Sequence, residues 1–598
     1  MSTWQHEIAG HLRKRWTAKT HAHEKFTQIN MNNSTLATVP PQLRKNRLPL
    51  VLLMLGLLVW LLPFTLGLAG YSGSKALYVL FSIVTGIMLV TGFQKMTGYG
   101  YLFLTIFLWL GFWLKLTIHT ILSYPFVEPV GSFVGSAQAW DEVLFTATVA
   151  SLGVILGKLL YNQIKSRFGA MHGEIKPVVP PWYANSRKWL WAGLMVTGAT
   201  VLLVNLKYGI HQIGLAPRTI LMWPLNAGIA WLLNIGLATG ITVLLWWDIA
   251  LKKNLTVPIY AIIAEALVSS VSILSRAAYV FHAIPQLWAA HRFKHTFKGW
   301  SHAKTGLLVA IFALLLVVSI SAVTTFRNYL YQSGAYLSTA YQVAYARSEA
   351  LMSAIAAEQL KIKNSSPAER VALEKRVREL LAEKLKLDAI AAKEKAKSDE
   401  AMKSGSAQSK VLLNEFGYQI TGGSSTLMLQ LSVDRWIGLE GLMAVQSYPE
   451  KNRDLLWQAL NEKPEAGKPD IYQTVSDSIY LKSDGTKFRF ATLPGAAAFL
   501  YYSGSLLIVL LGMVFFSLAV LVIEFVINAL TANPILCSLY GAVIASNVAQ
   551  FGGSPQLSLP YFLMLACGIL LVWIVQTRLF TQVLHKLKLL NTAQPRDD

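Results

Sequence analysis

Runs of apolar residues long enough to cross a bilayer recur along most of this chain. A helix needs about 20 such residues to cross a hydrocarbon core of ~30 Å. The runs lie at residues 48–70, 76–93, 102–122, 143–161, 189–206, 227–250, 257–280, 305–324, 496–525, 534–550 and 561–577. Together they predict an all-α polytopic membrane protein with about 11 to 12 transmembrane helices.

A long polar interval late in the chain separates two groups of predicted spans. We expect a basic tail at 1–47, an N-terminal transmembrane bundle at 48–324, an insertion at 325–494, C-terminal transmembrane helices at 495–577 and a second tail at 578–598. The first tail contains no apolar stretch of the kind found in a signal peptide, so it is expected to be retained.

The composition agrees with a membrane protein. Hydrophobic residues make up 54% of the chain and charged residues 14%, which is too apolar for a soluble domain of this length. Both cysteines, Cys537 and Cys567, fall inside predicted spans, and no His or Cys spacing of a metal site is present. Neither a disulfide outside the membrane nor a metal centre is therefore expected.

The net charge of +22 comes mostly from the tails and the short loops. Of 53 basic and 31 acidic residues, the insertion holds 23 and 20, which leaves 30 and 11 elsewhere. The basic clusters lie in both tails, at 165–188, at Lys252 and Lys253, and at 292–304. The positive-inside rule places them in the cytoplasm and the insertion outside. Because this charge follows the membrane edges without a recognition motif, nucleic acid is not an expected partner.

The charge pattern leaves one part of the topology open. Lys252, Lys253 and the cluster at 292–304 all look cytoplasmic, yet only one span of ordinary length lies between them. Either residues 257–291 enter the membrane and return as a broken or re-entrant hairpin, or residues 219–250 contain an extra half-helix. Broken helices in membranes line cavities, so this region points to a site.

The insertion divides into two parts. Residues 336–403 predict a helical hairpin whose second helix opens with Ser366-Pro367-Ala368-Glu369, a capping box with proline at the first helical position. This hairpin is either a solvated spacer or a docking arm for a partner helix. Residues 411–494 mix apolar, aromatic and charged side chains, which indicates a segment at the membrane surface.

Ionisable residues in or beside the spans are the candidates for chemistry, because a charge in the membrane is expensive and usually has a function or a partner. A contact between helices or snorkelling to the interface is equally expected for each residue alone. In combination, basic and aromatic groups on the outer side suit an anionic, lipid-linked substrate. The candidates are Lys115, His119, Glu128, His211, Arg218, Glu265, Arg276, Arg435, Trp436 and Glu440.

Leu274-Ser275-Arg276-Ala277-Ala278 resembles the Ser-Arg-Gly/Ala stretch of bacterial O-antigen polymerases and related oligosaccharide repeat-unit polymerases. The layout is similar too, because those proteins carry one long periplasmic loop with an essential arginine late in the chain, followed by a few spans. Arg435 stands in the matching place, and residues 221–228 resemble the proline-containing run before a span of the family. The hairpin at 336–403 departs from the usual loop.

The resemblance implies glycosyl transfer at the outer face of the bacterial inner membrane. A sugar hydroxyl of one lipid-linked oligosaccharide would attack the anomeric carbon of another and expel polyprenyl pyrophosphate. Arg276 and Arg435 would hold the pyrophosphate, and Glu440 would take the acceptor proton, with His211 or Glu128 behind it. Glu440 could instead pair with Arg435 as a structural salt bridge. The resemblance implies no metal or other cofactor.

Three other functions stay open on the sequence alone. A ligase of the same superfamily would move the finished glycan to another acceptor. A flippase or other transporter would also carry broken helices and buried charges. An envelope scaffold would use the hairpin at 336–403 to recruit a partner, and a polymerase could dock a chain-length regulator there.

Overall fold

The computed structural model describes residues 60–94, 98–123, 126, 128–167, 179–215, 217–292, 302–333, 339–363, 365–404, 433, 436–463, 469–477, 493–551, 555–577, 580 and 582. This part of the chain is all-helical, with 82% helix and no strand. Eight of its helices are long and apolar enough to span a membrane, which agrees with a multi-pass membrane protein. They are Lys75–Phe93 (α3), Tyr99–Leu122, Ala137–Arg167 (α6), Tyr183–Tyr208 (α7), Trp223–Ala250, Ala303–Arg327, Leu506–Thr531 (α21) and Ser558–Val575.

Three shorter apolar helices, Trp60–Gly70, Thr256–Ser272 (α10) and Pro534–Ala549 (α22), occupy three more of the predicted spans. Two predicted spans have a different shape from the one expected. The run at 257–280 is not one helix, because α10 ends at Ser272 and a new helix, Arg276–Arg292 (α11), begins after three residues. The run at 496–525 is divided into Ala496–Tyr501 (α20) and α21.

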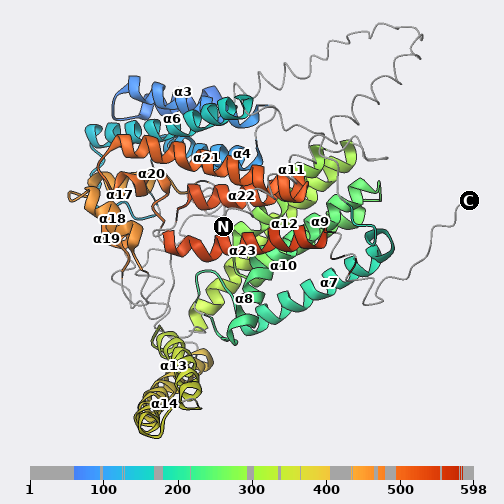
Figure 1. Ribbon diagram of the computed structural model, residues 1–598. Helices are drawn as coiled ribbons and strands as arrows, with labels where there is room; N and C mark the ends of the chain where they lie inside the picture. Colours follow the sequence, from blue (N-terminus) through green and yellow to red (C-terminus); the bar gives the residue numbers. More distant parts are fainter. Residues whose placement is uncertain are drawn as a thin grey trace, which may run out of the picture. The chain divides into compact units, whose positions relative to one another are not determined.

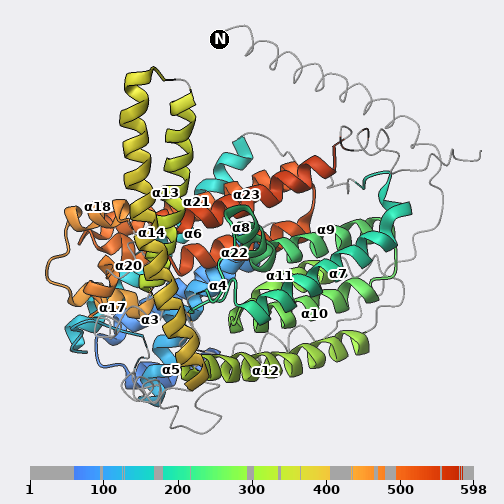
Figure 2. The same ribbon diagram turned by 90° about the horizontal axis from the view of Figure 1, so that it is seen from below.

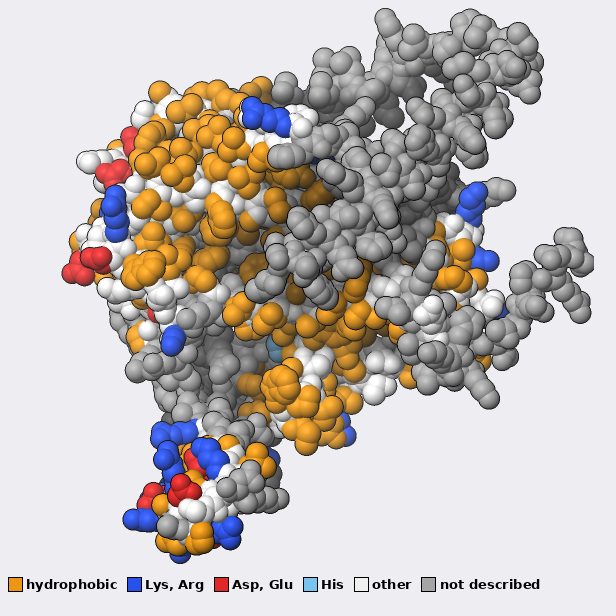
Figure 3. Space-filling model, viewed as in Figure 1, with side chains coloured by type: hydrophobic (Ala, Val, Ile, Leu, Met, Phe, Trp, Pro, Cys, Tyr) orange, Lys and Arg blue, Asp and Glu red, His pale blue; other side chains and the backbone are white. Residues whose placement is uncertain are grey.

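The spans present apolar side chains on their outward faces, as lipid-facing helices do. Figure 3 shows hydrophobic side chains covering the face made by α3, α6 and α21. Exposed examples are Val90 on α3, Leu152 on α6 and Phe515 on α21. Contact of such apolar faces with water is unfavourable, so a hydrocarbon environment accounts for their exposure.

Small residues bring the spans close together. Gly541 of α22 lies against the backbone of Gly100 in Tyr99–Trp109 (α4), where an added Cβ would come within 2.6 Å of the Gly100 nitrogen. Gly153 and Gly157 of α6 meet α21 in the same manner, and Figure 1 shows α6 and α21 side by side. Close backbone approach through glycine is a common way to pack transmembrane helices.

Two spans are interrupted by a π-helical turn. Residues Leu110–Leu114 (η1) join α4 to Lys115–Leu122 (α5), and Leu232–Gly236 (η2) joins Trp223–Trp231 (α8) to Leu237–Ala250 (α9). A π-turn leaves part of the regular hydrogen-bond ladder and re-aims the side chains beside it, and such turns are frequent at functional sites.

Helices α10 and α11 form an antiparallel hairpin, which Figure 2 shows beside α7 and α9. The turn at 273–275 depends on Leu274, whose φ of 56° lies in the left-handed region. Each helix has 17 residues and is about 26 Å long at 1.5 Å per residue. The chain returns to the side it came from, which is the first of the two alternatives for residues 257–291. The second alternative adds no crossing, because α8, η2 and α9 follow one another without a break.

The predicted hairpin of the insertion is confirmed as Thr339–Lys363 (α13) and Pro367–Ser404 (α14), which follow His302–Ser333 (α12). Glu369 accepts hydrogen bonds from the Ser366 backbone nitrogen at 3.2 Å and from its hydroxyl at 2.8 Å, so α14 begins at the predicted box. Across the hairpin, the Ser348 hydroxyl donates to Asp388 at 2.6 Å.

The rest of the insertion contains Leu439–Ser447 (α17), Arg453–Asn461 (α18) and Ile471–Val475 (α19), and the chain ends its described helices with Pro555–Val575 (α23). Helix α17 packs against α6 and α20. Residues 439–445 are all buried. Residues 439–445 therefore belong to the packed body of the protein, and the position of residues 411–494 at the membrane surface stays a prediction.

Candidate functional site at the tip of the α10–α11 hairpin

The turn of the α10–α11 hairpin is held by the loop between α7 and α8. The Ile213 nitrogen in that loop donates to the Ile273 oxygen at 2.8 Å, and the Ser275 nitrogen donates back to the Ser270 oxygen at 2.9 Å. Leu274 packs with Leu215 of the same loop in a small buried cluster. The left-handed residue is thus fixed from several sides, which is how strained backbone persists.

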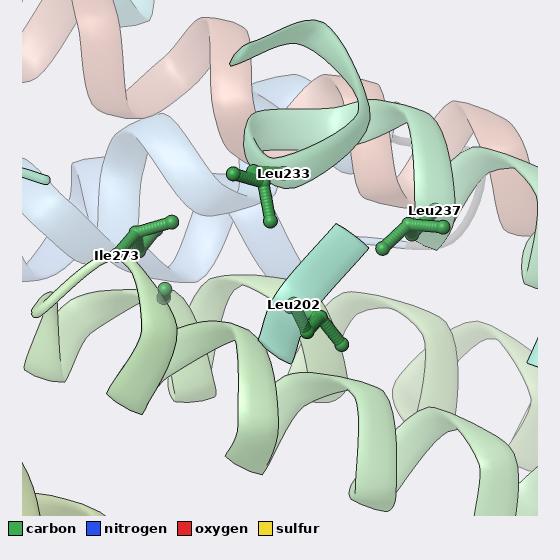
Figure 4. Close-up of a cluster of buried hydrophobic side chains, with 5 residues drawn as sticks. Leu202, Leu233, Leu237 and Ile273 are labelled. Carbon is green, nitrogen blue, oxygen red and sulfur yellow. The ribbon is translucent and has the colours of Figure 1, made fainter. Parts of the chain in front are cut away.

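A second apolar cluster lies beneath the turn. Ile273 packs with Leu202 of α7, Leu233 of η2 and Leu237 of α9 in one buried cluster, whose side chains are drawn in Figure 4. Leu233 is fully buried. The tip of the hairpin therefore rests on a defined core and presents α11 at a fixed place.

Three arginines belong to the elements that meet at this tip. Arg276 is the first residue of α11. Arg218 closes the loop after α7, because its nitrogen donates to the Gly209 oxygen at 2.9 Å and its Nη2 to the Leu206 oxygen at 3.0 Å. Arg327 of α12 donates from Nη2 to the Ile213 oxygen at 2.7 Å. The tip thus gathers positive charge at the N-terminus of a helix, which itself favours anions.

Arg327 was not among the residues predicted from the sequence. It follows the predicted span at 305–324 by three positions, where a basic residue usually flanks a membrane helix. Its hydrogen bond to Ile213 and the packing of Val323 against Leu215 show that α12 reaches the loop.

A buried polar network runs from the same tip into the bundle. His282 of α11 faces Glu265 of α10, with 2.9 Å between Nδ1 and Oε1, and its Nε2 lies 3.1 Å from the Asn234 backbone oxygen. The Ser269 hydroxyl also donates to the Glu265 Oε1 at 2.6 Å. Both ring nitrogens of His282 face acceptors, which is the arrangement of an imidazolium paired with a carboxylate.

Asn234 extends this network to His211. Its side-chain amide lies 3.0 to 3.2 Å from the His211 Nε2, and Asn234 sits in the π-turn η2. Asn205 of α7 holds the His211 backbone, accepting from its nitrogen at 2.7 Å and donating to its oxygen at 2.9 Å. Asn205 also donates to the Ser272 oxygen at 2.9 Å. His211 is therefore fixed to the end of α10.

The environment of His211 favours the neutral imidazole. Burial lowers the pKa of His211 from its usual value, and the hydrogen bond with Asn234 offsets this only in part. A histidine in this state carries a lone pair at neutral pH, as a general base requires.

The insertion reaches the bundle through aromatic rings. Trp436 stacks on Phe107 of α4, with ring centroids 5.5 Å apart, and Phe107 meets the edge of Phe281 of α11 at 5.4 Å. A Cβ added at Gly111 would lie 2.4 Å from the backbone oxygen of Ile437. The backbone of the insertion is therefore in close contact with the helix that contains Gly111. Arg435 lies outside the described residues, but the residue after it is joined through this stack to the helix that Arg276 begins.

Lys115 and Glu440 form a buried ion pair between α5 and α17. The exposed fractions of the two side chains are 0% and 2%. Among the sequence candidates, this pair and Trp436 lie together, whereas His211, Arg218, Glu265 and Arg276 lie at or below the hairpin tip. Lys115 is thus a partner of Glu440, and the alternative pairing of Glu440 with Arg435 stays a prediction, because Arg435 lies outside the described residues.

His119 and Glu128 lie near the end of α5. The His119 ring stacks on Phe126 with centroids 3.9 Å apart. Burial, together with the Glu440 and Glu128 carboxylates, raises the pKa of Tyr472 in α19 well above its usual value. Glu128 therefore lies on the Glu440 side of the bundle.

An apolar cavity of about 280 Å³ lies at the opposite end of the hairpin from the turn. It opens between α10, α11 and α12, and Ile259, Trp288 and Leu308 are among its lining residues. Its walls suit hydrocarbon and offer little to a sugar or a phosphate. The hairpin tip, with its arginines and histidine, is the better candidate for chemistry.

Within the described residues, no group of three His, Cys, Asp or Glu side chains is arranged to hold a metal ion. Comparison with protein-family models, with curated proteins and with solved structures finds no match for the chain.

Proposed function

We propose that this protein is a glycosyltransferase that polymerises lipid-linked oligosaccharide repeat units at the outer face of the bacterial inner membrane. The observation that supports it most is the convergence at the hairpin tip. Arg276 begins α11, while Arg218 and Arg327 hydrogen-bond to the loop that clasps the turn. Guanidinium groups bind pyrophosphate oxygens through paired hydrogen bonds and keep their charge at low dielectric.

In this proposal the substrate is a polyprenyl-pyrophosphate-linked oligosaccharide that enters from the bilayer. The pyrophosphate is held at the N-terminus of α11, where the helix dipole and Arg276 both favour its negative charge. As the bond from the anomeric carbon to the pyrophosphate breaks, the leaving group gains charge, and these cations stabilise it. Arg435 supplies a further cation from the insertion.

The insertion has a defined part in this proposal. The stack of Trp436 on Phe107 joins it to α11, and the Lys115–Glu440 pair fastens α17 to α5. Together they close the outer side of the site over the acceptor sugar. Glu440 acts here as an anchor of the insertion, since its carboxylate faces a buried lysine.

The first test is the length distribution of surface glycans in cells that lack this protein. The cells are rescued with the wild-type protein, with Arg276→Ala or with Arg435→Ala, and membrane levels are measured in parallel. Arg347→Ala is the matched control, because Arg347 forms an exposed pair with Glu383 on the insertion hairpin. We expect single repeat units in the deletion and in both site variants, and full-length glycan in the control.

Unchanged glycans in the deletion would reject the proposal. Loss of the transfer to a final acceptor, with polymer still formed on the lipid carrier, would indicate a ligase.

A transporter for the same lipid-linked sugar is the second candidate. The short, separate helices α10 and α11 favour it, because transporters place the N-termini of broken helices against anionic substrates. The two functions differ in where the single repeat unit accumulates. In the Arg276→Ala strain, a polymerase leaves lipid-linked units on the outer leaflet, whereas a transporter leaves them on the inner leaflet.

A further inference from the structure

We propose that His211 is the general base that removes the proton from the acceptor sugar hydroxyl. This inference rests on the proposed function and names the residue that performs its proton transfer. The sequence offered Glu440 first for this role and His211 behind it. The geometry at the hairpin tip reverses that order.

His211 lies in the loop that holds the hairpin turn. His211 lies two residues before Ile213, whose nitrogen donates to the Ile273 oxygen at 2.8 Å, and Arg276 follows three residues after Ile273. Asn205 ties the His211 backbone to Ser272 at the other side of the same turn. The histidine and the arginine are therefore held at one tip by backbone hydrogen bonds.

The imidazole ring of His211 is oriented by Asn234. The His211 Nε2 faces the Asn234 amide at 3.0 to 3.2 Å. In the tautomer whose Nε2–H donates to the Asn234 Oδ1, Nδ1 keeps its lone pair. His211 is partly exposed, so a substrate can approach it.

The other buried acid–base groups of the described residues are less suited than His211 to act as the base. His282 is buried, and both of its nitrogens face acceptors, so it has no lone pair to offer. Its carboxylate partner is Glu265 on α10. Glu440 is buried against Lys115. Of these groups, His211 alone combines exposure with an environment that keeps it neutral.

Charged groups lie on every element that meets around His211. Arg218 belongs to the same loop, Arg327 of α12 donates to the Ile213 oxygen, and Arg276 begins α11. Lys207 stands near the end of α7, and Glu265 with His282 lies beyond Asn234. Once the acceptor hydroxyl has lost its proton, the same cations help to hold the leaving pyrophosphate.

In the proposed step, the acceptor hydroxyl displaces polyprenyl pyrophosphate from the donor sugar. The acceptor hydroxyl oxygen forms a bond to the anomeric carbon of the donor, and its proton passes to the His211 Nδ1. The bond from that carbon to the pyrophosphate oxygen breaks, and the electron pair leaves with polyprenyl pyrophosphate. The imidazolium then releases its proton to water, so no oxidant, reductant or further reactant is needed.

The test uses the full-length protein in lipid nanodiscs with purified polyprenyl-pyrophosphate-linked oligosaccharide. We expect His211→Gln to lower kcat by about 100-fold or more, the usual contribution of a general base, with KM little changed. The wild-type rate should rise with pH through the lowered pKa of His211 and then level off. This rise should be absent from the residual rate of the variant. His291→Gln is the control, because His291 lies at the cavity end of α11.

A His211→Gln protein within about threefold of wild type would overturn the inference, as would a loss confined to KM. If that variant is not monodisperse, His211→Ala is assayed with and without added imidazole. Recovery of the rate with imidazole supports the base, and a folded variant without recovery argues against it. If the wild-type protein itself makes no polymer, the proposed function is rejected. The reaction in which His211 would act as the base is then rejected with it.

Discussion

Lys115 of α5 and Glu440 of α17 form a buried ion pair although 325 positions separate them in the chain. Two charges leave water to form it, and this penalty is recovered only while both partners are present. The pair is thus a fastening between the first bundle and the insertion, and it is sensitive to the loss of either side chain.

We expect Glu440→Leu to destabilise the protein by about 3–5 kcal/mol, because the charge of Lys115 would stay buried without its Glu440 partner. The double variant Lys115→Met with Glu440→Leu should recover much of that loss. Thermal unfolding in detergent measures both. Glu383→Leu is the control, since its partner Arg347 is largely exposed and surface pairs contribute little. A melting temperature of Glu440→Leu equal to that of the Glu383→Leu control would show that other groups compensate the charge of Lys115.

The close contact of α4 with α22 gives a second prediction. An added methyl group at Gly541 would meet the backbone nitrogen of Gly100 at 2.6 Å, and a backbone cannot rotate away as a side chain can. We therefore expect Gly541→Ala to reduce the yield of folded protein strongly. Size-exclusion chromatography of the solubilised membrane fraction measures this yield.

Gly86→Ala is the matched control, because nothing lies within 4 Å of a Cβ at Gly86 on α3. This change should leave the yield unaltered or raise it, since alanine favours a helix by about 1 kcal/mol over glycine. Equal yields from the two variants would mean that α4 and α22 can separate without penalty.

The sequence predicted the spans well because apolar length is a local signal. It also predicted the insertion hairpin, since Ser366 and Glu369 announce the start of α14 within four residues. The break between α10 and α11 could only be suspected from the basic residues on both sides. Its turn depends on Leu274 in a left-handed conformation, and neither glycine nor proline marks that place.

The candidate site was predicted as a set of residues, and the contacts among them were not. His211, Glu265 and Arg276 were named, but His282 and Asn234, which connect His211 to Glu265, carried no signal in an apolar helix. Long-range pairs such as Lys115 with Glu440 depend on tertiary packing, which a single sequence does not reveal. Arg435 still stands as a sequence prediction, because it lies outside the described residues.

The Trp436–Phe107 stack gives a third prediction. Trp436→Ala removes one of the rings that join the insertion to α4, and an aromatic pair contributes about 0.5–1.5 kcal/mol beyond its buried area. We expect faster proteolysis within the insertion and shorter surface glycans. Trp436→Phe should preserve both properties, because a ring remains.

Trp457→Ala is the control for this experiment, since 67% of the Trp457 side chain is exposed on α18. Digestion at the same rate in Trp436→Ala and Trp457→Ala would show that the stack does not hold the insertion.

The fourth prediction concerns pH. Asp470 caps α19, and its carboxylate accepts from the Gln473 nitrogen at 2.7 Å. Burial nevertheless raises the pKa of Asp470, and its backbone hydrogen bonds offset this only in part. The folded protein thus favours the protonated acid. As pH rises from the ordinary carboxyl range through the raised pKa, ionisation of Asp470 increasingly lowers the free energy of unfolding. Above the raised pKa this loss of stability is constant.

Asp470→Asn keeps an oxygen that can cap the helix and removes the charge. We expect its melting temperature to match that of wild type below about pH 4, near the ordinary pKa of an aspartate, and to exceed it increasingly at higher pH. Glu462 strengthens the effect, because burial raises its pKa and the charge of Asp470 raises it further. Asp454→Asn in the first turn of α18 serves as the comparison. A melting temperature for Asp470→Asn that falls below wild type as pH rises would mean that the cap hydrogen bonds outweigh the cost of burying the charge.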